Sequence, residues 1–521
     1  MNGATLRSRL ADSVRRARPT LPLDGRDRPW LALAVLPGCV AVAVYLVTNP
    51  YPAYGAGLYA RAAAEILANG YHPPVRVPGY TAEGVPFAYP PLGLYLLATL
   101  FDLGVDPIAV SRVFPGVVVV VAGVPAYLLG RDVVGSRPAG AAVAAMVALN
   151  PQVLEWHVSA GGVVRAVAFL SALIAVYAGY HVFAHDGRRP VLVGAFAFGS
   201  TVLTHPSYAL FVVVSCLLFW EVLDRSGRGL LRGAAVGIGG TAVAAPWLGW
   251  VLDTHGPGVL AAAAGTHGGI GGGGLELLAG ELSPYVLVPA GAAAYLLLGR
   301  RYLIPAWFVA AAALFAQPRF AYTVGALALA AAASDLEGRL PVLDGARRCP
   351  DRRALVAGLL IAGSVAGGAY LAHEATLVAD PTTPEFLDDD AVAAMEWAAS
   401  GTPEEATFVV LGDAAEWFPA LAERTILVGP WGVEWRGPGA YDAQFRAFET
   451  VSACRSAGCV EATAAAVGGT PDYVYVPKGR YTVRGEGAVQ FGSLERSFGL
   501  SERWEHAFEN EGVVIYRSVD R

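Results

Sequence analysis

The sequence NPYPAYGAGLYARAAAEILANGYHPP (49–74), followed by GVPFAYPPLGLYLL (84–97), separates the first hydrophobic stretch of the chain from all later ones. Leu58, Ala62 and Ile66 recur at i, i+4 and i+8, which predicts a short amphipathic helix. Such a helix lies at a membrane surface, with its apolar face towards lipid or towards neighbouring spans. The prolines of the second part favour extended backbone before the chain turns back into apolar sequence.

The composition does not fit a water-soluble globule, because 55% of the 521 residues are hydrophobic and only 15% are charged, with a mean hydropathy of +0.47. A helix needs about 20 apolar residues to cross a hydrocarbon core of about 30 Å. Residues 90–104 reach only about 22 Å, so we expect them to form a re-entrant helix. We predict an α-helical polytopic membrane protein with about eleven transmembrane helices, at residues 31–48, 108–130, 138–154, 161–183, 190–204, 207–222, 231–252, 284–299, 303–317, 319–334 and 354–373.

Arginine clusters between the predicted spans all fall on one side of the membrane, which the positive-inside rule makes cytoplasmic. The sequence thus predicts an arginine-rich cytoplasmic N-terminus (1–29), a transmembrane domain (30–379) with its first external loop at 49–89, and an extracellular C-terminal domain (380–521). We expect a multi-pass protein of the cell (plasma) membrane. The clusters are Arg7 to Arg28, Arg131 and Arg137, Arg188 and Arg189, Arg225 to Arg232, Arg300 and Arg301, and Arg339 to Arg353.

Residues 380–521 differ in composition from the membrane part, since they contain 23 acidic residues against 11 basic ones. An acidic surface of this kind argues against nucleic acid as a partner. Acidic residues at 388–390 predict a capped helix, and runs at 407–411 and 472–477 predict buried strands. With a terminal hairpin over 504–517, these elements predict a C-terminal extracytoplasmic α/β domain.

Three further features of this domain leave alternatives open. Cys454 and Cys459 form either a disulfide, which an external location permits, or two free thiols. The aromatic segment PWGVEW (430–435) either latches the domain onto the membrane part or stacks on a sugar or acceptor. Lys478 is the single lysine of the chain. With the acidic surface, it favours a salt-adapted source such as a halophilic archaeon, although codon bias alone explains the arginine preference equally well.

The order of short motifs along the membrane part is informative. A helix ending in Asn-Gly is followed by YPPLG (89–93), Ser-Arg-Val (111–113), Gly-Arg-Asp (130–132) and Ala-Pro-Trp (245–247). This order, over roughly residues 30–335, resembles the GT-C class of membrane glycosyltransferases, in particular the protein O-mannosyltransferase and aminoarabinose transferase group. The resemblance implies transfer of a sugar from a polyprenyl-phosphate donor in the membrane lipid to a glycan or protein acceptor on the external face.

The resemblance also implies which groups carry the chemistry. A carboxylate activates the acceptor or orients a divalent metal, and cationic or polar groups hold the lipid phosphate. In the family the carboxylate begins an Asp-Glu or Asp-x pair just before the surface helix, where this chain has Gly55 and Ala56. A further acid of some members falls near Tyr89. The family's metal ligands are therefore not evident, so we predict no metal site and leave a divalent metal cofactor open.

Other residues on the expected external side are candidates for the missing roles. Glu83 lies in the same loop, Glu155 in the next external turn and Asp253 after the Ala-Pro-Trp motif, where each is a substitute carboxylate or a solvated loop residue. Arg165 stands about three residues inside a predicted span, and an arginine there is costly unless it is paired or faces a cavity. We predict that it binds the donor phosphate, with His205, His157 and Tyr89 as further substrate-binding residues.

Two other functions remain open from the sequence. The replacement of the family carboxylate by Gly55 is consistent with a catalytically inactive, GT-C-like lipid- or glycan-binding membrane protein. A secondary transporter is less well supported, because the sequence has no internal repeat and no paired, broken helices with intramembrane acids.

The arginine distribution gives a testable topology. Cysteine labelling or protease protection on intact cells should find the N-terminus cytoplasmic and residues 380–521 outside, because basic loops stay in the cytoplasm. A C-terminal domain protected from external protease would contradict both the topology and the resemblance.

Overall fold

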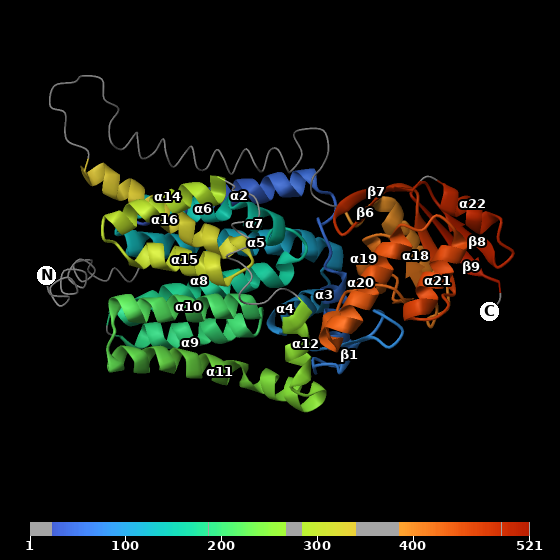
Figure 1. Ribbon diagram of the computed structural model, residues 1–521, viewed down its shortest axis with the longest axis horizontal. Helices are drawn as coiled ribbons and strands as arrows, with labels where there is room; N and C mark the ends of the chain where they lie inside the picture. The colour runs from blue at the N-terminus through green and yellow to red at the C-terminus, as the bar shows by residue number, and fades with distance from the viewer. Residues whose placement is uncertain (1–22, 186, 267–283, 340–384, 491, 520–521) are drawn as a thin grey trace, which may run out of the picture.

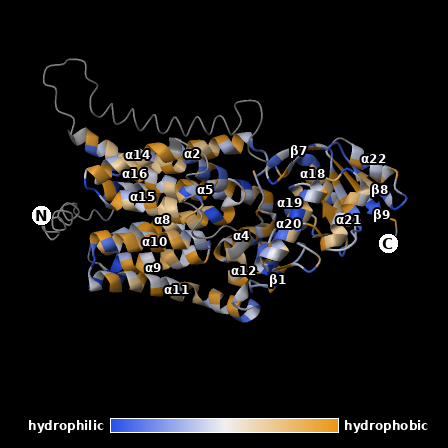
Figure 2. Ribbon diagram, viewed as in Figure 1, coloured by the Kyte–Doolittle hydropathy of each residue, from blue (hydrophilic) through white to orange (hydrophobic). Residues whose placement is uncertain are grey.

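The computed structural model describes residues 23–185, 187–266, 284–339, 385–490 and 492–519. It consists of a bundle of long helices and a C-terminal α/β domain that lies at one end of that bundle (Figure 1). The predicted span at 354–373 and the glycine-rich part of the predicted external loop lie outside the described residues. Hydrophobic residues predominate along the bundle, whereas hydrophilic ones are frequent in the C-terminal domain (Figure 2).

Each of the ten predicted spans in the described ranges contains a helix. By length and composition, α2, α5, α8, α10 and α11 are long and apolar enough to cross a membrane, which is fewer than the eleven expected spans. Several other helices are too short to span a membrane by this criterion, since a helix of 12 residues such as α6 or α15 reaches only about 18 Å. The bundle helices are α2 (Arg28–Thr48), α5 (Pro107–Val134), α6 (Arg137–Ala148), α8 (Gly162–Ala184), α9 (Arg188–Val202), α10 (Pro206–Leu223), α11 (Gly227–His255), α14 (Pro284–Leu298), α15 (Leu303–Leu314) and α16 (Pro318–Arg339).

Helix ends and helix contacts in the bundle follow from local sequence. Helix α5 begins with a proline at its first position, is capped by Asp106, whose carboxylate accepts from the Ala109 N–H (2.8 Å), and ends at Gly135 with φ of +78°. Small residues let α5 and α6 approach closely, because a Cβ atom at Gly140 would lie 2.7 Å from the Tyr127 carbonyl oxygen.

The segment between α2 and α5, called here the first loop, contains the predicted amphipathic helix. This helix is α3 (Gly57–Ala68), and the predicted re-entrant segment contains α4 (Leu92–Asp102), which at 11 residues is too short to span. Ala62 and Ile66 are buried as the periodicity predicts. The helix packs against α4 and against the C-terminal domain, a neighbour that an amphipathic pattern cannot specify. The remaining elements at this end are β1 (Arg76–Val77), β2 (Val85–Pro86), α7 (Pro151–Trp156) and α12 (Gly258–Thr266).

The C-terminal domain has the predicted α/β character. Its main sheet has the strand order β4-β3-β5-β9-β8, in which β4, β3 and β5 are parallel and β9 and β8 antiparallel. Both predicted strands and the terminal hairpin are present, and the Asp388 carboxylate caps the first helix by accepting from Ala391 N–H (2.7 Å). A disulfide joins Cys454 and Cys459. The elements are α18 (Asp389–Gly401), β3 (Thr407–Val410), α19 (Ala414–Leu421), β4 (Thr425–Ile426), η1 (Val433–Arg436), α20 (Pro438–Ser452), α21 (Ala457–Val467), β5 (Tyr473–Pro477), β6 (Gly479–Val483), β7 (Glu486–Gln490), α22 (Ser493–Gly499), β8 (Trp504–Glu509) and β9 (Val513–Ser518).

Hydrogen bonds to main-chain carbonyl groups hold the C-terminal domain on the first loop. The Ile426 N–H donates to the Gly79 carbonyl (2.8 Å), and the Tyr80 hydroxyl donates to the Glu416 carbonyl (2.6 Å). Gly57, the first residue of α3, lies directly against α19: a Cβ atom there would overlap the Glu416 carbonyl oxygen and lie 2.6 Å from Trp417 Cα. The two segments therefore approach this closely only because position 57 has no side chain.

Replacing Gly57 with alanine should loosen this contact, because the added Cβ meets backbone that has no flexible side chain to move. Overpacking of this kind costs about 1 to 3 kcal/mol. We expect faster proteolytic release of the C-terminal domain and a lower thermal midpoint. The matched control is Gly439→Ala in α20, where a Cβ meets nothing within 4 Å. Equal protease resistance of the two variants would contradict the proposed contact.

Candidate active site at the junction of the two domains

Gly55 lies where the first loop meets α19 of the C-terminal domain. A Cβ atom at Gly55 would overlap Cδ and Oε2 of Glu416 and lie 2.5 Å from Oε1. The Glu416 carboxylate therefore fills the space that a side chain at position 55 would enter. The preceding residue, Tyr54, has φ of +60°, an uncommon backbone conformation for a residue with a side chain. Its carbonyl accepts from the Trp417 indole N–H (3.4 Å), which ties the loop to α19 on the other side of Gly55.

Glu416 is a buried carboxylate in the first turn of α19. Its residue is 8% exposed, and burial is the main cause that raises its pKa to about 8. The nearby charge of Asp413 raises the pKa further, while Arg165 and a hydrogen bond from the Trp431 side chain lower it. Burial likewise raises the pKa of the neighbouring Glu434 to about 7. Two carboxyl groups that titrate near neutral pH at one junction mark it as a candidate for acid–base chemistry.

Arg165 lies in the first turn of α8, at the end of the bundle next to the C-terminal domain. Its guanidinium stands over the Trp156 ring at 5.2 Å from the centroid, and a Cβ atom at Gly161 would overlap Nη1. The side chain therefore folds back past a glycine towards the junction and is within electrostatic range of Glu416.

Arg319, the second residue of α16, belongs to a buried chain of hydrogen bonds. His157 Nδ1 donates to the Gln152 carbonyl (3.2 Å), so its Nε2 accepts from the Tyr208 hydroxyl (2.5 Å). The Tyr208 oxygen in turn accepts from Arg319 Nη1 (3.1 Å), and the guanidinium also stands 5.4 Å from the Tyr208 ring centroid. Arg319 Nε is buried without a hydrogen-bond partner. His157 is thus a neutral acceptor that orients Tyr208, which orients Arg319.

Arg165 and Arg319 are enclosed in the bundle without an acidic partner, in contrast to the buried Arg131 of the same bundle. Within the described ranges, neither of the two forms an ion pair, although each is within electrostatic range of the other. By contrast, Arg131 pairs with Asp27 (3.1 Å) and with Asp132 (2.7 Å). Two partly or fully buried cations without a counter-ion are costly unless a ligand supplies the negative charge.

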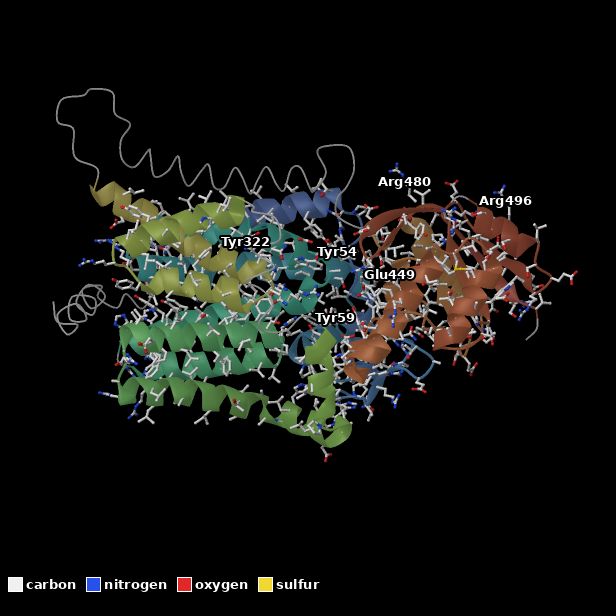
Figure 3. The ribbon with its side chains drawn as sticks, viewed as in Figure 1. Tyr54, Tyr59, Tyr322, Glu449, Arg480 and Arg496 are labelled. Atoms are coloured by element: carbon white, nitrogen blue, oxygen red, sulfur yellow. A yellow bond between two sulfur atoms is a disulfide. The ribbon has the colours of Figure 1, made fainter. Side chains whose placement is uncertain are left out.

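Aromatic side chains line the space between the two arginines and the C-terminal domain. His205 packs edge-on against Tyr208 (5.2 Å between centroids) and Tyr89 (6.4 Å), and Tyr89 in turn contacts Tyr59 (5.2 Å) and Trp435 (6.2 Å). Tyr59 and Tyr54 both lie at the boundary between the bundle and the C-terminal domain (Figure 3). Tyr59, Tyr89 and Trp435 also line a small, largely apolar pocket between the first loop and η1. The aromatic segment 430–435 therefore contributes both to domain contact and to the lining of this pocket.

The three substitute carboxylates expected from the sequence lie in different surroundings. Glu83 has a side chain that is 76% exposed and stands 3.6 Å from the Arg436 guanidinium, and Asp253 is exposed near the end of α11. Glu155 is half-buried on α7, where it accepts from the Tyr54 hydroxyl (3.3 Å) and the Gln152 amide (3.1 Å). Of the expected acids, only Glu155 is partly enclosed at the junction.

Sequence reasoning missed Glu416, Glu434 and Arg319. Glu416 and Glu434 belong to the C-terminal domain, which the sequence predicts as a separate unit, and no local sequence pattern connects them with the first loop. Arg319 did offer a signal, since it falls at the start of a predicted span on the side opposite to the arginine clusters. That position contradicts the positive-inside pattern and so indicates a functional arginine.

The described residues do not fit a metal ion. They contain no group of three or more His, Cys, Asp or Glu side chains arranged to hold one. Asp413, the acid nearest to Glu416 along α19, already accepts from the Arg484 and Gly485 N–H groups (2.8 Å each). Arg165 adds positive charge beside Glu416, which opposes binding of a cation there. No chemical step is therefore assigned to a metal.

Comparison with known proteins gives structural matches only. No protein family and no curated protein sequence matches the chain. The apo oligosaccharyltransferase of Archaeoglobus fulgidus matches with a TM-score of 0.54 and 14% identity over 86% of this chain and 69% of that chain. ArnT from Cupriavidus metallidurans, bound to undecaprenyl phosphate, matches with a TM-score of 0.52 and 14% identity over 92% of this chain and 97% of that one. The arabinofuranosyltransferase AftD from Mycobacteria matches with a TM-score of 0.57 and 16% identity over 94% of this chain and 40% of that chain.

The chain has the GT-C fold. The GT-C fold that the motif order implies is thereby confirmed, while the particular group is not distinguished. A matched share of 92% includes the bundle and most of the C-terminal domain, so the GT-C likeness is not limited to the membrane helices. At identities of 14–16% this likeness concerns the fold alone, and the chemistry has to be argued from the residues at the junction.

The raised pKa of Glu416 predicts how stability depends on pH. Between the ordinary glutamate pKa of 4.5 and about 8, the folded protein binds more protons at this site than the unfolded chain. Stability should therefore fall as pH rises through this window, by up to about 1.4 kcal/mol per pH unit. Glu416→Gln cannot titrate, so its thermal midpoint should match the wild type near pH 5 and exceed it near pH 8.5.

The exposed Glu405→Gln change is the control for loss of one negative charge from the same domain. The measurement is thermal unfolding in detergent at both pH values, followed by tryptophan fluorescence. A wild-type protein that gains stability relative to Glu416→Gln as pH rises would contradict the burial argument.

Proposed function

We propose that the protein transfers a sugar from a polyprenyl-phosphate donor to a hydroxyl group of a glycan or protein acceptor at the membrane surface. The observation that carries this proposal is the convergence near Tyr208 of two guanidinium groups without acidic partners, Arg165 and Arg319, of which Arg165 is also within electrostatic range of the buried Glu416 carboxylate. Structures with the same fold are known with dolichol-phosphate and with undecaprenyl phosphate. A lipid phosphate is a ligand that would supply the missing negative charge.

The phosphate chemistry follows from the properties of arginine. A guanidinium is planar, stays charged and presents several N–H donors, which suits bidentate binding of phosphate oxygens. Tyr208 and His157 fix the position of Arg319, and the Trp156 ring supports Arg165. When the bond between the sugar and the phosphate breaks, negative charge grows on the phosphate. Donors already positioned around it stabilise that charge without further reorganisation.

The aromatic lining suits the sugar part of the donor or the acceptor. Aromatic rings of Tyr59, Tyr89 and Trp435, with the two tyrosine hydroxyl groups, line a small pocket next to the first loop. Ligand pockets of this kind are mostly apolar with a few placed polar groups. The polyprenyl chain itself requires only an apolar path between or beside the bundle helices, and exposed apolar side chains such as Leu192, Phe196 and Leu217 provide one.

The orientation completes the proposal. Arginine clusters in the loops opposite the C-terminal domain support an orientation in which that domain and the junction are external. The acidic surface of residues 380–521 fits an external, salt-rich medium and a salt-adapted, archaeal source. Sugar transfer would then occur on the extracytoplasmic side, onto exported acceptors.

A second candidate function is binding of a polyprenyl-phosphate sugar, or of a glycan, without transfer. Gly55 favours it, because the first loop of this chain supplies no carboxylate at that position. Both functions need the arginine pair, so donor binding is expected in either case, and only a transfer assay separates them.

Replacing Arg165 or Arg319 with glutamine should weaken binding of undecaprenyl phosphate about tenfold to a hundredfold, since a hydrogen bond to a charged group contributes about 1.5 to 3 kcal/mol. Binding can be measured with the lipid and the purified protein in nanodiscs. Arg188→Gln is the control, because Arg188 is an exposed arginine at the start of α9. Unchanged affinity in both site variants would overturn the phosphate assignment.

A further inference from the structure

The carboxylate that the first loop lacks is present at the same place on another part of the chain. Any side chain at position 55 would enter the space that the Glu416 carboxylate occupies. We infer that Glu416, carried by the C-terminal domain, is the catalytic base that accepts the proton of the acceptor hydroxyl. This inference rests on the proposed function and goes beyond it, since it makes the active site a product of two domains.

The position of Glu416 is fixed from several directions. Tyr80 of the first loop donates to its carbonyl oxygen (2.6 Å), and Trp417, the next residue, donates to the Tyr54 carbonyl (3.4 Å). Gly57 leaves room for the α19 backbone itself. The loop thus has two glycines, one opposite the carboxylate and one opposite the main chain of the same residue. A mere packing contact would not require a carboxylate in the first of these two spaces.

Burying a carboxylate is unfavourable, and an apolar residue would fill this space at lower cost. Glu416 is 8% exposed and lacks an ion pair within 4.0 Å among the described residues. The groups that face it are Asp413 on its own helix, Arg165 from α8, Trp431 from the loop before η1 and Glu434 from η1. Retention of a poorly compensated buried acid beside a phosphate-binding arginine is characteristic of catalytic sites.

The proposed step is balanced in atoms and charge. The acceptor oxygen forms a bond to the anomeric carbon of the sugar, and its proton moves to a carboxylate oxygen of Glu416. The bond between the anomeric carbon and the phosphate oxygen breaks, and its electron pair leaves with the polyprenyl phosphate. Arg165 and Arg319 hold the phosphate as it gains charge, and Glu416 later releases its proton to water.

Glu434 and Glu155 are the alternatives for the same role. Glu434 is half-buried on the neighbouring element η1, and Glu155 is occupied by hydrogen bonds from Tyr54 and Gln152. Neither carboxylate occupies the space beside Gly55, which sets Glu416 apart from both.

The test moves the carboxylate from one segment to the other. Transfer is measured with purified protein in nanodiscs, using the sugar-labelled polyprenyl-phosphate fraction extracted from the producing cells, and undecaprenyl phosphate binding is measured alongside. Glu416→Gln should reduce transfer by about 10²- to 10⁴-fold, the usual effect of losing a general base, while binding persists. Gly55→Asp alone should also reduce transfer, because its side chain collides with Glu416.

The double variant Gly55→Asp with Glu416→Gly is the decisive one. It returns the acid to the first loop and removes the collision, so transfer should recover at least tenfold over either single variant. Glu405→Gln is the matched control for a lost negative charge in the same domain and should transfer at the wild-type rate. In the wild type, transfer should rise about tenfold per pH unit below the midpoint of the base, and that midpoint should change in the double variant.

The outcomes separate this inference from the proposed function. Normal transfer by Glu416→Gln overturns the inference and leaves the proposed function standing. A wild-type protein that binds undecaprenyl phosphate but transfers no sugar overturns both, in favour of a binding protein. If Glu416→Gln loses binding as well as transfer, the double variant decides: recovery supports the inference, and a lack of recovery overturns it. Loss of transfer in Glu434→Gln with full transfer in Glu416→Gln would assign the base to Glu434.

Discussion

The contact between α19 and the first loop determines how the two domains of this protein are placed. Both loop positions that face Glu416 are glycines: the main chain of residue 57 lies directly against the α19 main chain, and that of residue 55 lies against the Glu416 carboxylate. A contact of this kind allows little variation, since backbone cannot rotate away as a long side chain can. The pocket lining from η1, the burial of Glu416 and its distance from Arg165 all depend on this one approach.

The buried charges at the junction differ from those in the rest of the bundle in how they are compensated. Arg131, Asp132 and His181 satisfy one another within a buried network, in which His181 Nε2 lies 3.0 Å from the Asp132 carboxylate. Such a network holds helices together without needing a ligand. At the junction, Arg165 and Glu416 are within electrostatic range of each other, but the described residues provide neither with an ion pair. Burying a charged group without a counter-ion is unfavourable, and a bound anion would offset that cost. A binding site differs in this way from a structural network, whose charges already satisfy one another.

Local patterns in the sequence predicted local structure well. The period of Leu58, Ala62 and Ile66 located α3, and β-branched and aromatic runs located β3 and β5. Arg165 could be singled out because an arginine inside a span is unusual in itself. Glu416 could not, since its role depends on a partner in the first loop, and the Tyr80 hydrogen bond to it joins residues 336 positions apart. Gly55 and Ala56 show that the first loop lacks the family's carboxylate, but a single sequence does not show which other residue occupies that space. The precision of the predicted span count was limited for a similar reason, because hydropathy alone does not show where a short helix such as α6 ends.

The mutual exclusion between a side chain at position 55 and a carboxylate at position 416 has an evolutionary consequence. A chain cannot pass from one arrangement to the other by keeping both acids, because they would occupy the same volume. Nor can it lose one acid before gaining the other without an intermediate that lacks the group altogether. Relatives of this protein should therefore divide into two groups, with an acid in the loop or an acid in α19. An ancestor between the two groups would have had no acid at this place in either segment.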